Sequence, residues 1–540
     1  MRHLIVCCDG TWNTADQEAV TNVRRLYNAL APTDDAGRKQ LARHLPGVGT
    51  AGGLASRLVG GAFGLALHPR GRLTSSVGLG LDEAVMEGYH WLVTTYQPED
   101  RIALFGFSRG AYTARSLAGL IAMCGLISTA GMGEEETWRR INDVYDRYRQ
   151  GPHGDPHWRD GLTFLYDPTD AEKIPVQFIG VWDTVGSLGI PDHLRWFAPA
   201  FSASRYAFHD VKLNPNVKHG RHAVAMDERR GPFSPTLWGE PEPGQDVKQV
   251  WFPGSHMDVG GGHRETGLSD RALQWMIDEA KTAIQLGFHK KTEEQIKPDA
   301  LDVVHDDDRT ALGWLNPLLA PGLEPFLALR PRAVPLVDPD ASQPAQELDI
   351  SVYDRQQAPP ITSGPYRPTR VLARGESATV EVRADESWDD TGLYLQSGSY
   401  HFTSEGEWLD RDIPSSPDGN GGIRLRQQPI EGALRGVGTL STELEKLFRR
   451  QPGSETAYVP LARREPDLPW MSLVGYVAND AIAVNGGSKT AHQRIAIGRD
   501  RTHYVTKGGY FYAFANDAWG FYGNNHGTVR LTVTRIPEDA

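Results

Sequence analysis

The sequence of 540 residues has few cysteines, no long apolar run and only a small surplus of charge. Three cysteines are too few for a disulfide framework or a multi-cysteine zinc site. Cys7 and Cys8 lie in an apolar run typical of small buried thiols, so we expect synthesis in a reducing compartment. The 68 acidic and 56 basic residues are spread along the chain. No basic stripe is available to neutralise phosphates, and we therefore expect no nucleic acid partner.

Targeting signals are also missing from the sequence. The first apolar run, residues 4–8, is too short for a signal peptide and ends at Asp9, so we expect a protein made in the bacterial cytoplasm without a leader. Residues 45–67 contain seven glycines and Arg57, which favours a Gly-rich flap over a membrane-spanning helix. Whether this flap acts as a lid or makes transient contact with a membrane surface is left open by the sequence.

The pattern of apolar residues divides the chain near residue 290. Residues 1–290 alternate short apolar runs with helical stretches, which predicts βα units on a parallel sheet. The predicted strands are residues 4–8, 102–105, 176–182 and 247–252, and the predicted helices are residues 81–97 and 112–124. Residues 291–372 are Pro-rich and weakly patterned, which predicts an irregular cover and connector belonging to the first domain. Residues 373–540 predict an all-β domain, with β-forming runs at 380–383, 394–402, 472–477, 495–497 and 529–533.

A nucleophile elbow is the strongest chemical motif. Residues 104–112 read Leu-Phe-Gly-Phe-Ser-Arg-Gly-Ala-Tyr, which is a predicted strand, then G-x-S-x-G, then the start of a helix. A serine hydroxyl attacks well when a sharp turn lifts it clear of the sheet, and such a turn leaves no room for side chains at Gly106 and Gly110. The motif predicts Ser108 as a catalytic nucleophile. The alternative is an ordinary turn between a strand and a helix.

Such a nucleophile needs an acid and a base, each just past the carboxyl end of a later strand. Strand 176–182 is followed by Asp183, and the loop after strand 247–252 carries His256. We predict His256 as the general base and Asp183 as the carboxylate that orients it. A helix cap at 183 and a structural histidine at 256 are the alternative interpretations. The rivals, none of which follows a strand so directly, are Asp258 as the acid and His219, His222 or His263 as the base.

An oxyanion formed by acyl transfer needs hydrogen-bond donors. The amide of Arg109 opens the helix after Ser108, where the helix dipole also favours negative charge. A second donor is expected in the loop after the first strand, from the amide of Gly10 or Thr11, although Asp9 can simply cap this turn.

Four blocks in this order resemble a known family. They are residues 8–13, 106–115, 181–186 and 251–261. Over roughly residues 1–370 the sequence is similar to the catalytic domain of the type VI secretion phospholipase effectors and their uncharacterised relatives. The resemblance implies an α/β-hydrolase that cleaves fatty acyl esters of glycerophospholipids, with Ser108, Asp183 and His256 as its triad. It also implies secretion machinery as a partner and delivery to a target cell, although the missing leader fits a resident cytoplasmic enzyme equally well.

A second candidate site lies near the C-terminus. Residues 516–527 read Asn-Asp-Ala-Trp-Gly-Phe-Tyr-Gly-Asn-Asn-His-Gly between two β-rich runs. One carboxylate and two neighbouring carboxamides in a tight loop can converge on a hard cation such as Ca²⁺. A hairpin turn without a metal is the alternative.

Residues 375–540 resemble the calcium-dependent galactophilic lectin of pseudomonads. The resemblance implies a calcium ion held by the side chains of Asp517, Asn524 and Asn525 and by the carbonyl of Phe521, with sugar hydroxyls completing the shell. The family takes another ligand from an earlier loop, which matches the region of residues 405–406. Residues 410–422 differ from the sugar-contacting loop of the lectin, so the calcium expectation rests on more residues than the galactose expectation.

The fold expected from these observations is α/β, an α/β-hydrolase with a doubly wound sheet followed by a lectin-like all-β sandwich. The expected function is a serine hydrolase acting on acyl esters of phospholipids, with a carbohydrate-binding β domain that raises the local substrate concentration. A deacylase of acylated glycans would use the same triad. A non-catalytic glycan-binding scaffold is the alternative outside the enzyme class.

Overall fold

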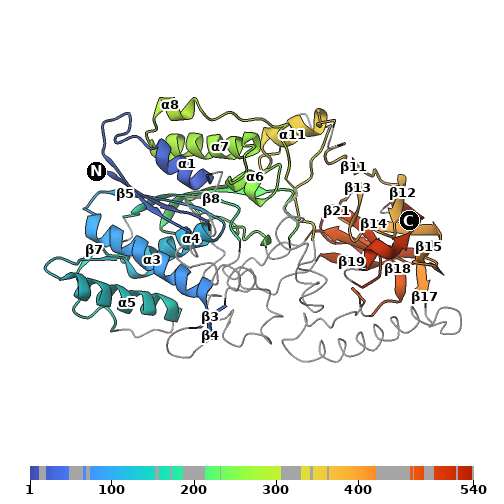
Figure 1. Cartoon of the computed structure of the whole chain (residues 1–540), viewed down its shortest axis with the longest axis horizontal. Coiled ribbons are helices and arrows are strands. Elements are labelled where there is room, and N and C mark those ends of the chain that lie inside the picture. The colour runs from blue at the N-terminus through green and yellow to red at the C-terminus, as the bar shows by residue number, and fades with distance from the viewer. Residues whose placement is uncertain are drawn as a thin grey trace.

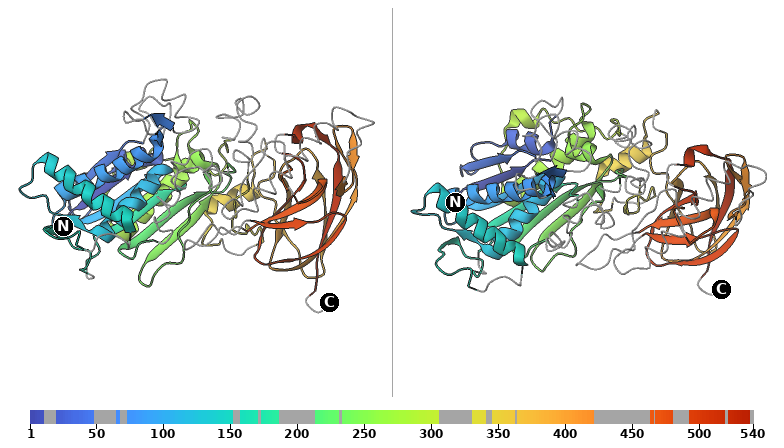
Figure 2. Two further views of the ribbon diagram at one scale, coloured as in Figure 1. Left: turned by 90° about the horizontal axis from the view of Figure 1, so that it is seen from below. Right: turned by 60° about the horizontal axis from the view of Figure 1, so that its bottom comes forward.

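The computed structural model describes residues 1–10, 20–47, 65–67, 73–151, 157–170, 173–185, 213–230, 233–305, 330–340, 345–361, 364–420, 463–465, 467–479, 492–518 and 521–537, with the backbone alone for 65–67 and 73–80. Most of the predicted Gly-rich flap therefore lies outside the described residues. An N-terminal α/β domain and a C-terminal β domain lie next to each other along the longest axis of the molecule (Figures 1 and 2).

The N-terminal domain is built on a six-stranded sheet in the order β10-β9-β8-β5-β1-β2. The strands are β1 (His3–Cys8), β2 (Gln40–Leu45), β5 (Arg101–Phe107), β8 (Val176–Trp182), β9 (Val217–Ala225) and β10 (Asp246–Phe252). Every neighbouring pair is parallel. Strand addition reverses direction between β1 and β5, and doubly wound sheets bind their ligands at the carboxyl ends beside such a point.

Helices cover both faces of this sheet (Figure 1). The helices of the domain are α1 (Asn22–Ala29), α3 (Ser76–Thr95), α4 (Arg109–Cys124), α5 (Glu134–Gln150), α6 (His256–Gly260), α7 (Gly267–Ile284), α8 (Lys290–Glu293) and α11 (Ile350–Gln357). Strand β1 explains the two layers, because Leu4 and Val6 pack in the core with α3, α4 and α5, whereas Ile5 and Cys7 pack in the core with α1 and α7. This alternation of fully buried residues is what a central strand with two covered faces requires. Two short pairs complete the domain, β3 (Leu65–Leu67) with β4 (Leu73–Ser75) and β6 (Leu126–Ile127) with β7 (Phe164–Tyr166).

The four strands predicted for this domain correspond to β1, β5, β8 and β10, and the two predicted helices correspond to α3 and α4. Strand β9 was not predicted because its sequence, VKHGRHAVA, is interrupted by basic residues. Arg221 is nonetheless almost fully buried, because its guanidinium pairs with Asp246 at 2.5 Å and Glu279 at 2.5 Å. The pattern of apolar residues therefore does not reveal β9, because a buried, paired arginine occupies a position in the strand where an apolar residue is expected.

The β domain contains two facing sheets and one small sheet. The first has the order β11-β13-β21-β18-β17 with β19 beside β18, the second has the order β12-β23-β14-β20, and the small sheet has the order β16-β15-β22. The strands are β11 (Arg370–Val371), β12 (Ser377–Arg383), β13 (Asp389–Leu395), β14 (Gly398–Gly406), β15 (Trp408–Asp410), β16 (Ile413–Ser415), β17 (Asp418–Asn420), β18 (Trp470–Ala478), β19 (Gln493–Ala496), β20 (Asp500–Val505), β21 (Gly509–Ala515), β22 (Asn525–His526) and β23 (Thr528–Arg535), with a short helix, η5 (Tyr522–Asn524), before β22. Side chains from both sheets, such as Phe402 and Phe511, form one buried core. The run predicted at 394–402 is two strands, since the chain turns between β13 and β14.

The two domains share an apolar contact. Val334 and Val337 of the connector pack in one buried cluster with Val474, Tyr510 and Phe514 of the β domain. The same cluster includes Trp251 of β10. The connector thus joins the edge of the N-terminal sheet to the β21–β18 face of the β domain.

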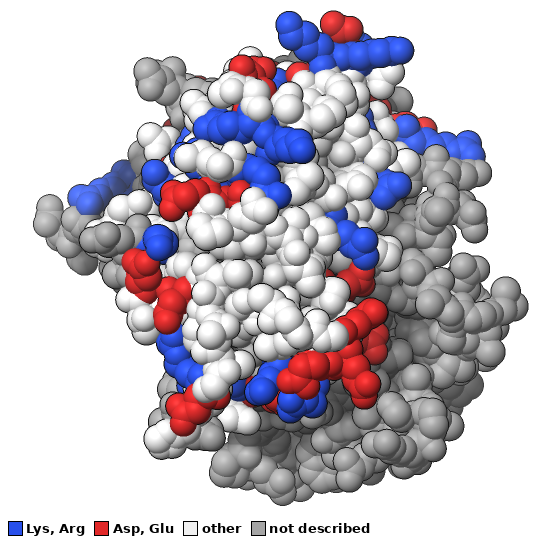
Figure 3. Space-filling model, turned by 90° about the vertical axis from the view of Figure 1, so that its left-hand side faces the viewer, with Lys and Arg blue, Asp and Glu red and all other residues white. Residues whose placement is uncertain are grey.

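Basic and acidic side chains are interspersed on the end of the molecule opposite the β domain (Figure 3). Ion pairs in the N-terminal domain include Arg2 with Asp100 at 2.6 Å and Arg159 with Asp167 at 2.5 Å. Among the described residues, no helix combines the length and the apolar character needed to cross a membrane.

Gly110 is the tightest point between β1 and α4, and it yields a test of the fold. A Cβ added there would lie 2.2 Å from the carbonyl oxygen of Cys8 and 2.4 Å from that of Asp9. We expect Gly110→Ala to destabilise the domain by about 1–3 kcal/mol or more, because backbone atoms must move. The matched control is Gly133→Ala, since a Cβ there meets nothing within 4 Å. Thermal unfolding should separate the two variants by several degrees, and equal melting temperatures would contradict the close approach of β1 to the turn.

Candidate active site

Ser108 occupies a sharp turn between β5 and α4. Its backbone has φ 57° and ψ −123°, a region that non-glycine residues rarely adopt and that stores strain at functional sites. The amide of Ser108 donates to the carbonyl of Trp182 at 3.1 Å, which ties the turn to the end of β8. At Gly106, an added Cβ would lie 2.4 Å from the carbonyl oxygen of Gly110. Both flanking glycines are therefore required by the close packing around this serine.

Asp183 follows β8 directly and is fully buried. Its Oδ1 accepts the amide hydrogen of Ala225 at 2.9 Å, and its Oδ2 lies 2.6 Å from Nδ1 of His256. Burial alone would raise the pKa of Asp183, but the Arg332 guanidinium and the hydrogen bonds from His256 and Arg332 hold this pKa well below its ordinary value. Asp183 is therefore a carboxylate, and it can orient an imidazole.

His256 begins the short helix α6, just after β10. A capping box holds this turn, because the side chains of Ser255 and Asp258 each accept the backbone amide hydrogen of the other residue. The imidazole of His256 packs between two rings, Phe107 at 4.6 Å and Phe233 at 4.8 Å between centroids. Because Phe107 immediately precedes Ser108, the imidazole lies against the residue next to the candidate nucleophile.

The candidate oxyanion donors differ in how they are engaged. The amide of Gly10 donates to Oδ1 of its neighbour Asp9 at 2.8 Å, so in this conformation it is used within the chain. Thr11 lies outside the described residues. The amide of Arg109 belongs to the first residue of α4, where helical geometry supplies no acceptor. Burial lowers the pKa of the Arg109 guanidinium to about 10.

The rival residues lie in other surroundings. Nε2 of His222 accepts the amide hydrogen of Thr184 at 3.1 Å, and burial lowers the pKa of His222 to about 3. His219 stands near the start of β9 and contacts Asp246 at 3.0 Å, toward the amino ends of the strands. Neither ring is placed beside Asp183 in the way that His256 is.

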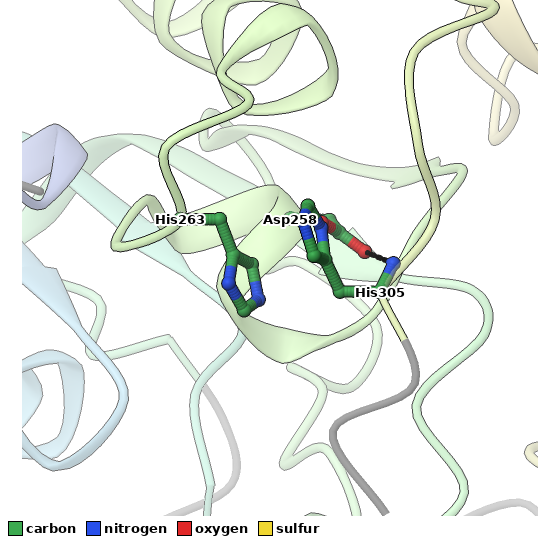
Figure 4. Close-up of side chains that lie close together, drawn as sticks. All are labelled: Asp258, His263 and His305. Atoms are coloured by element: carbon green, nitrogen blue, oxygen red, sulfur yellow. Dashed lines mark hydrogen bonds and ion pairs between the residues drawn. The ribbon is translucent and has the colours of Figure 1, made fainter. Parts of the chain in front are cut away.

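The third rival base, His263, belongs to a separate cluster with Asp258 and His305 (Figure 4). His305 Nδ1 lies 2.6 Å from Asp258 Oδ1, its Nε2 lies 3.2 Å from Glu265, and its ring stacks on that of His263 at 3.7 Å. The three potential ligand atoms of the cluster lie within 4.8 Å of one another, close enough for a metal ion. However, both nitrogens of His305 face carboxylates, and stacked rings do not direct their lone pairs to one point, so the arrangement favours a charged clamp over a metal centre.

Arg332 is a member of the site that the sequence did not indicate. Its Nη1 donates to Asp183 Oδ1 at 2.7 Å and its Nη2 donates to Asp183 Oδ2 at 3.0 Å. It lies in the segment interpreted from sequence as an irregular cover, where no motif or periodicity marks it. The bidentate geometry is the one in which arginine and carboxylate pair most strongly.

In the loop predicted to bind calcium, two of the four predicted ligand residues, Asp517 and Asn525, contact each other through their side chains. Asp517 Oδ2 accepts from Asn525 Nδ2 at 3.0 Å, and Asn524 Nδ2 lies 3.5 Å from Asp410 Oδ1. The carbonyl of Phe521 accepts the amide hydrogen of Asn524 at 3.2 Å. Within the part of the chain that the structure describes, the buried Oδ1 atoms of Asn524 and Asn525 have no hydrogen-bond partner. Two orphaned carbonyl oxygens beside a buried carboxylate fit an oxygen-preferring cation.

The resemblance also placed a ligand near residues 405–406, and this stays a prediction. Glu405 pairs with Arg530 at 3.0 Å on the exposed sheet. Asp410, at the end of β15, lies opposite Asn525 in the register of β15 and β22.

His305 supplies a pH-dependent prediction for the clamp around α6. The hydrogen bond to Asp258 raises the pKa of His305 to about 9, against about 6.5 in an unfolded chain. The clamp therefore stabilises the fold fully below pH ~6.5, and this contribution is lost as pH rises through about 9. We expect the melting temperatures of wild type and His305→Gln to differ most near pH 6 and to converge near pH 10. The control is His157→Gln, because the side chain of His157 is 78% exposed. If the difference in melting temperature between wild type and His305→Gln does not change with pH, the clamp is contradicted.

Comparisons with known proteins place this arrangement in a family. Residues 2–279 match the family described as "T6SS, Phospholipase effector Tle1-like, catalytic domain". The chain is 31% identical over 236 residues to the uncharacterized protein YEL023C of Saccharomyces cerevisiae, which covers 43% of this chain and 32% of that protein. The chain thus spans about a third of the length of this curated relative.

Three solved structures are similar to parts of the chain. An uncharacterized protein from Pseudomonas aeruginosa is 18% identical and has a TM-score of 0.30, covering 55% of this chain and 49% of that one. The Tle1 effector, solved bound to the VgrG spike of the type 6 secretion system, is 19% identical with a TM-score of 0.29, covering 49% and 51%. The N-terminal domain of EclA, a PllA-like lectin, is 15% identical with a TM-score of 0.17, covering 29% and 94%. Because the family match extends over residues 2–279, more than half of the sequence, the chain belongs to the family of Tle1-like type VI secretion phospholipase effectors through their catalytic domain.

Proposed function

We propose that the N-terminal domain is a carboxylic ester hydrolase that removes acyl chains from phospholipids with Ser108, His256 and Asp183. The observation that carries this proposal is the 2.6 Å contact between His256 Nδ1 and the buried Asp183 carboxylate, with the His256 ring packed on Phe107, the residue before a serine in a strained elbow. Membership in a phospholipase effector family supports the ester and lipid parts of the proposal.

The chemistry follows from these groups. Asp183 accepts Nδ1–H of His256, which leaves the Nε2 lone pair to take the proton from the Ser108 hydroxyl. The Ser108 oxygen then attacks the acyl carbonyl, and the amide of Arg109 and the dipole of α4 stabilise the oxyanion. Collapse of this intermediate breaks the ester bond, and the His256 proton passes to the leaving alcohol of the lysophospholipid. Water, deprotonated by His256, attacks the acyl-enzyme, releases the fatty acid and restores Ser108.

Export through a type VI secretion system is part of the same proposal. A relative, the Tle1 effector, has been solved on the VgrG spike, and the family is defined by such effectors. The partner proposed for this chain is therefore a spike component, and the substrate would be met at a membrane surface in the target cell.

The β domain is proposed to bind Ca²⁺ in the loop between β21 and β23. Asp517, Asn524 and Asn525 would supply side-chain oxygens, Phe521 would supply a carbonyl, and Asp410 would add a second carboxylate. The orphaned Oδ1 atoms of Asn524 and Asn525 support this assignment, because leaving buried acceptors unpaired costs about 1–3 kcal/mol each. A cation held there would order the loop and offer open positions to the hydroxyls of a glycan. Glycan binding would hold the enzyme at a decorated surface.

Removal of the nucleophile tests the hydrolase. We expect Ser108→Ala to lower fatty acid release from phospholipid vesicles by about 10⁴-fold or more, because the covalent step is lost. Ser128→Ala, a serine outside the site in the same domain, is the matched control and should keep full activity. An acetylated polysaccharide tested in parallel identifies a glycan deacylase if it is the only substrate cleaved. If the hydrolysis rates measured with wild type and Ser108→Ala are identical on both esters, the hydrolase proposal is wrong and the protein is a non-catalytic glycan-binding scaffold.

Removal of the cation tests the β domain. A ligand that binds only the folded state stabilises it by about 2.7 kcal/mol at a hundredfold excess over Kd. We therefore expect added Ca²⁺ to raise the melting temperature of chelator-treated wild type. Asn525→Ala and Asp517→Asn should abolish this increase, whereas Asn420→Ala, an asparagine in the same domain but outside the loop, should keep it. A wild-type melting temperature that is the same in chelator and in Ca²⁺ would rule out the site.

A further inference from the structure

Arg332 makes four hydrogen bonds inside the N-terminal domain. Besides both oxygens of Asp183, its guanidinium donates to the carbonyl of Ala225 at 2.5 Å and to that of Phe233 at 2.5 Å. Ala225 ends β9, and the Phe233 ring packs against the imidazole of His256. One side chain thus contacts the acid, the strand beside it and the residue that packs on the base.

The segment that carries Arg332 is also held by the β domain. Nε2 of His492 lies 2.9 Å from the carbonyl oxygen of Pro331, the residue before Arg332. Burial lowers the pKa of His492 to about 4, so its ring is neutral and can donate the single hydrogen to this carbonyl. Farther along, the amide of Val337 donates to the hydroxyl of Tyr510 at 3.1 Å. Val334 and Val337 are buried in the apolar cluster that contains Tyr510.

We propose that Arg332 is a positioning residue for the Asp183–His256 pair, and that the β domain holds Arg332 in place through His492 and Tyr510. This inference rests on the proposed hydrolase function, because it assigns a role to that pair. In this proposal the β domain has two roles: it binds a ligand, and it holds the residue that positions the Asp183–His256 pair.

The physical basis is the fixed shape of the guanidinium. Two parallel N–H groups fix the plane of the Asp183 carboxylate, and this orients Oδ2 toward His256 Nδ1. A lysine in place of Arg332 would keep the charge but lose this plane. Misplacement of a catalytic group by about 1 Å can lower a rate by ~10²-fold, so the effect on turnover should be large even though Arg332 does not touch the substrate.

Arg332 also places its charge beside the pair. Its Nη2 donates to Asp183 Oδ2, the same oxygen that contacts His256 Nδ1. In the part of the chain that the structure describes, Glu228 also contacts the residue, because its Oε2 accepts the His256 amide hydrogen at 3.3 Å while it pairs with Arg230 at 2.7 Å. Asp258 lies in the same short helix, α6.

The first experiment compares Arg332→Met and Arg332→Lys in the full chain, with kcat and KM for a soluble ester scaled to the concentration of active enzyme. We expect kcat to fall by about 10²-fold in Arg332→Met with little change in KM, because the pair is misplaced while the substrate contacts remain. Arg332→Lys should also lower kcat with little change in KM, because lysine keeps the charge but loses the plane of the guanidinium. If both variants lose thermal stability yet the active enzyme keeps the wild-type kcat, Arg332 has only a structural role and the proposal is wrong.

The second experiment leaves Arg332 intact and so remains informative if its variants do not fold. Tyr510→Phe removes only the hydroxyl, which contacts the Val337 amide and the Thr369 hydroxyl, and His492→Ala removes the donor to Pro331. Both should lower kcat by roughly three- to tenfold, the scale of one lost hydrogen bond of about 0.5–1.5 kcal/mol. Tyr504→Phe, an exposed tyrosine on β20, is the matched control and should retain the wild-type rate. Wild-type kcat in both interface variants would overturn the coupling.

The outcomes separate this inference from the function on which it rests. If Ser108→Ala abolishes ester hydrolysis but the Arg332, His492 and Tyr510 variants behave as wild type, only the positioning role fails. If Ser108→Ala retains activity, the proposed triad itself fails, whatever the other variants do.

Discussion

The carboxylate of Asp183 is completely buried and accepts four hydrogen bonds, from the Ala225 amide, from His256 and from both nitrogens of the Arg332 fork. A buried charge is tolerated only when it is paired in this way, and removing one partner of a buried pair commonly costs about 3–5 kcal/mol. The rest of the site depends on this group. It sets the orientation of the imidazole, it joins β8 to β9 through Ala225, and it draws in the connector that the β domain holds.

The parallel sheet explains why these residues meet at all. Ser108, Asp183 and His256 follow β5, β8 and β10, whose carboxyl ends lie on one edge of the sheet. The strained turn at Ser108 is possible because Gly106 and Gly110 admit backbone atoms where a Cβ would collide. On the far side of His256, the Asp258–His305 contact holds the short helix that presents it. The sheet, the turn at Ser108 and the short helix at His256 are therefore each held in place by contacts within the protein.

How much of this could be read from the sequence depends on how local each signal is. The elbow, Asp183 and His256 were predicted because each follows an apolar strand, and the strand ends of a parallel sheet converge. Arg332 could not be predicted, because its role arises from contacts 149 residues away with Asp183, in a stretch without periodicity. Strand β9 was missed because the buried Arg221 looks like a surface residue until its partners Asp246 and Glu279 are known.

The central claim is that the Asp183–His256 pair makes Ser108 a nucleophile. The most direct measurement is peptide mass spectrometry of the full chain after treatment with a fluorophosphonate, which reacts with activated serines. The account predicts one phosphonyl adduct, located on Ser108, forming rapidly in wild type and much more slowly in Asp183→Asn. An adduct on another serine, or an unmodified Ser108 in folded protein, would contradict it.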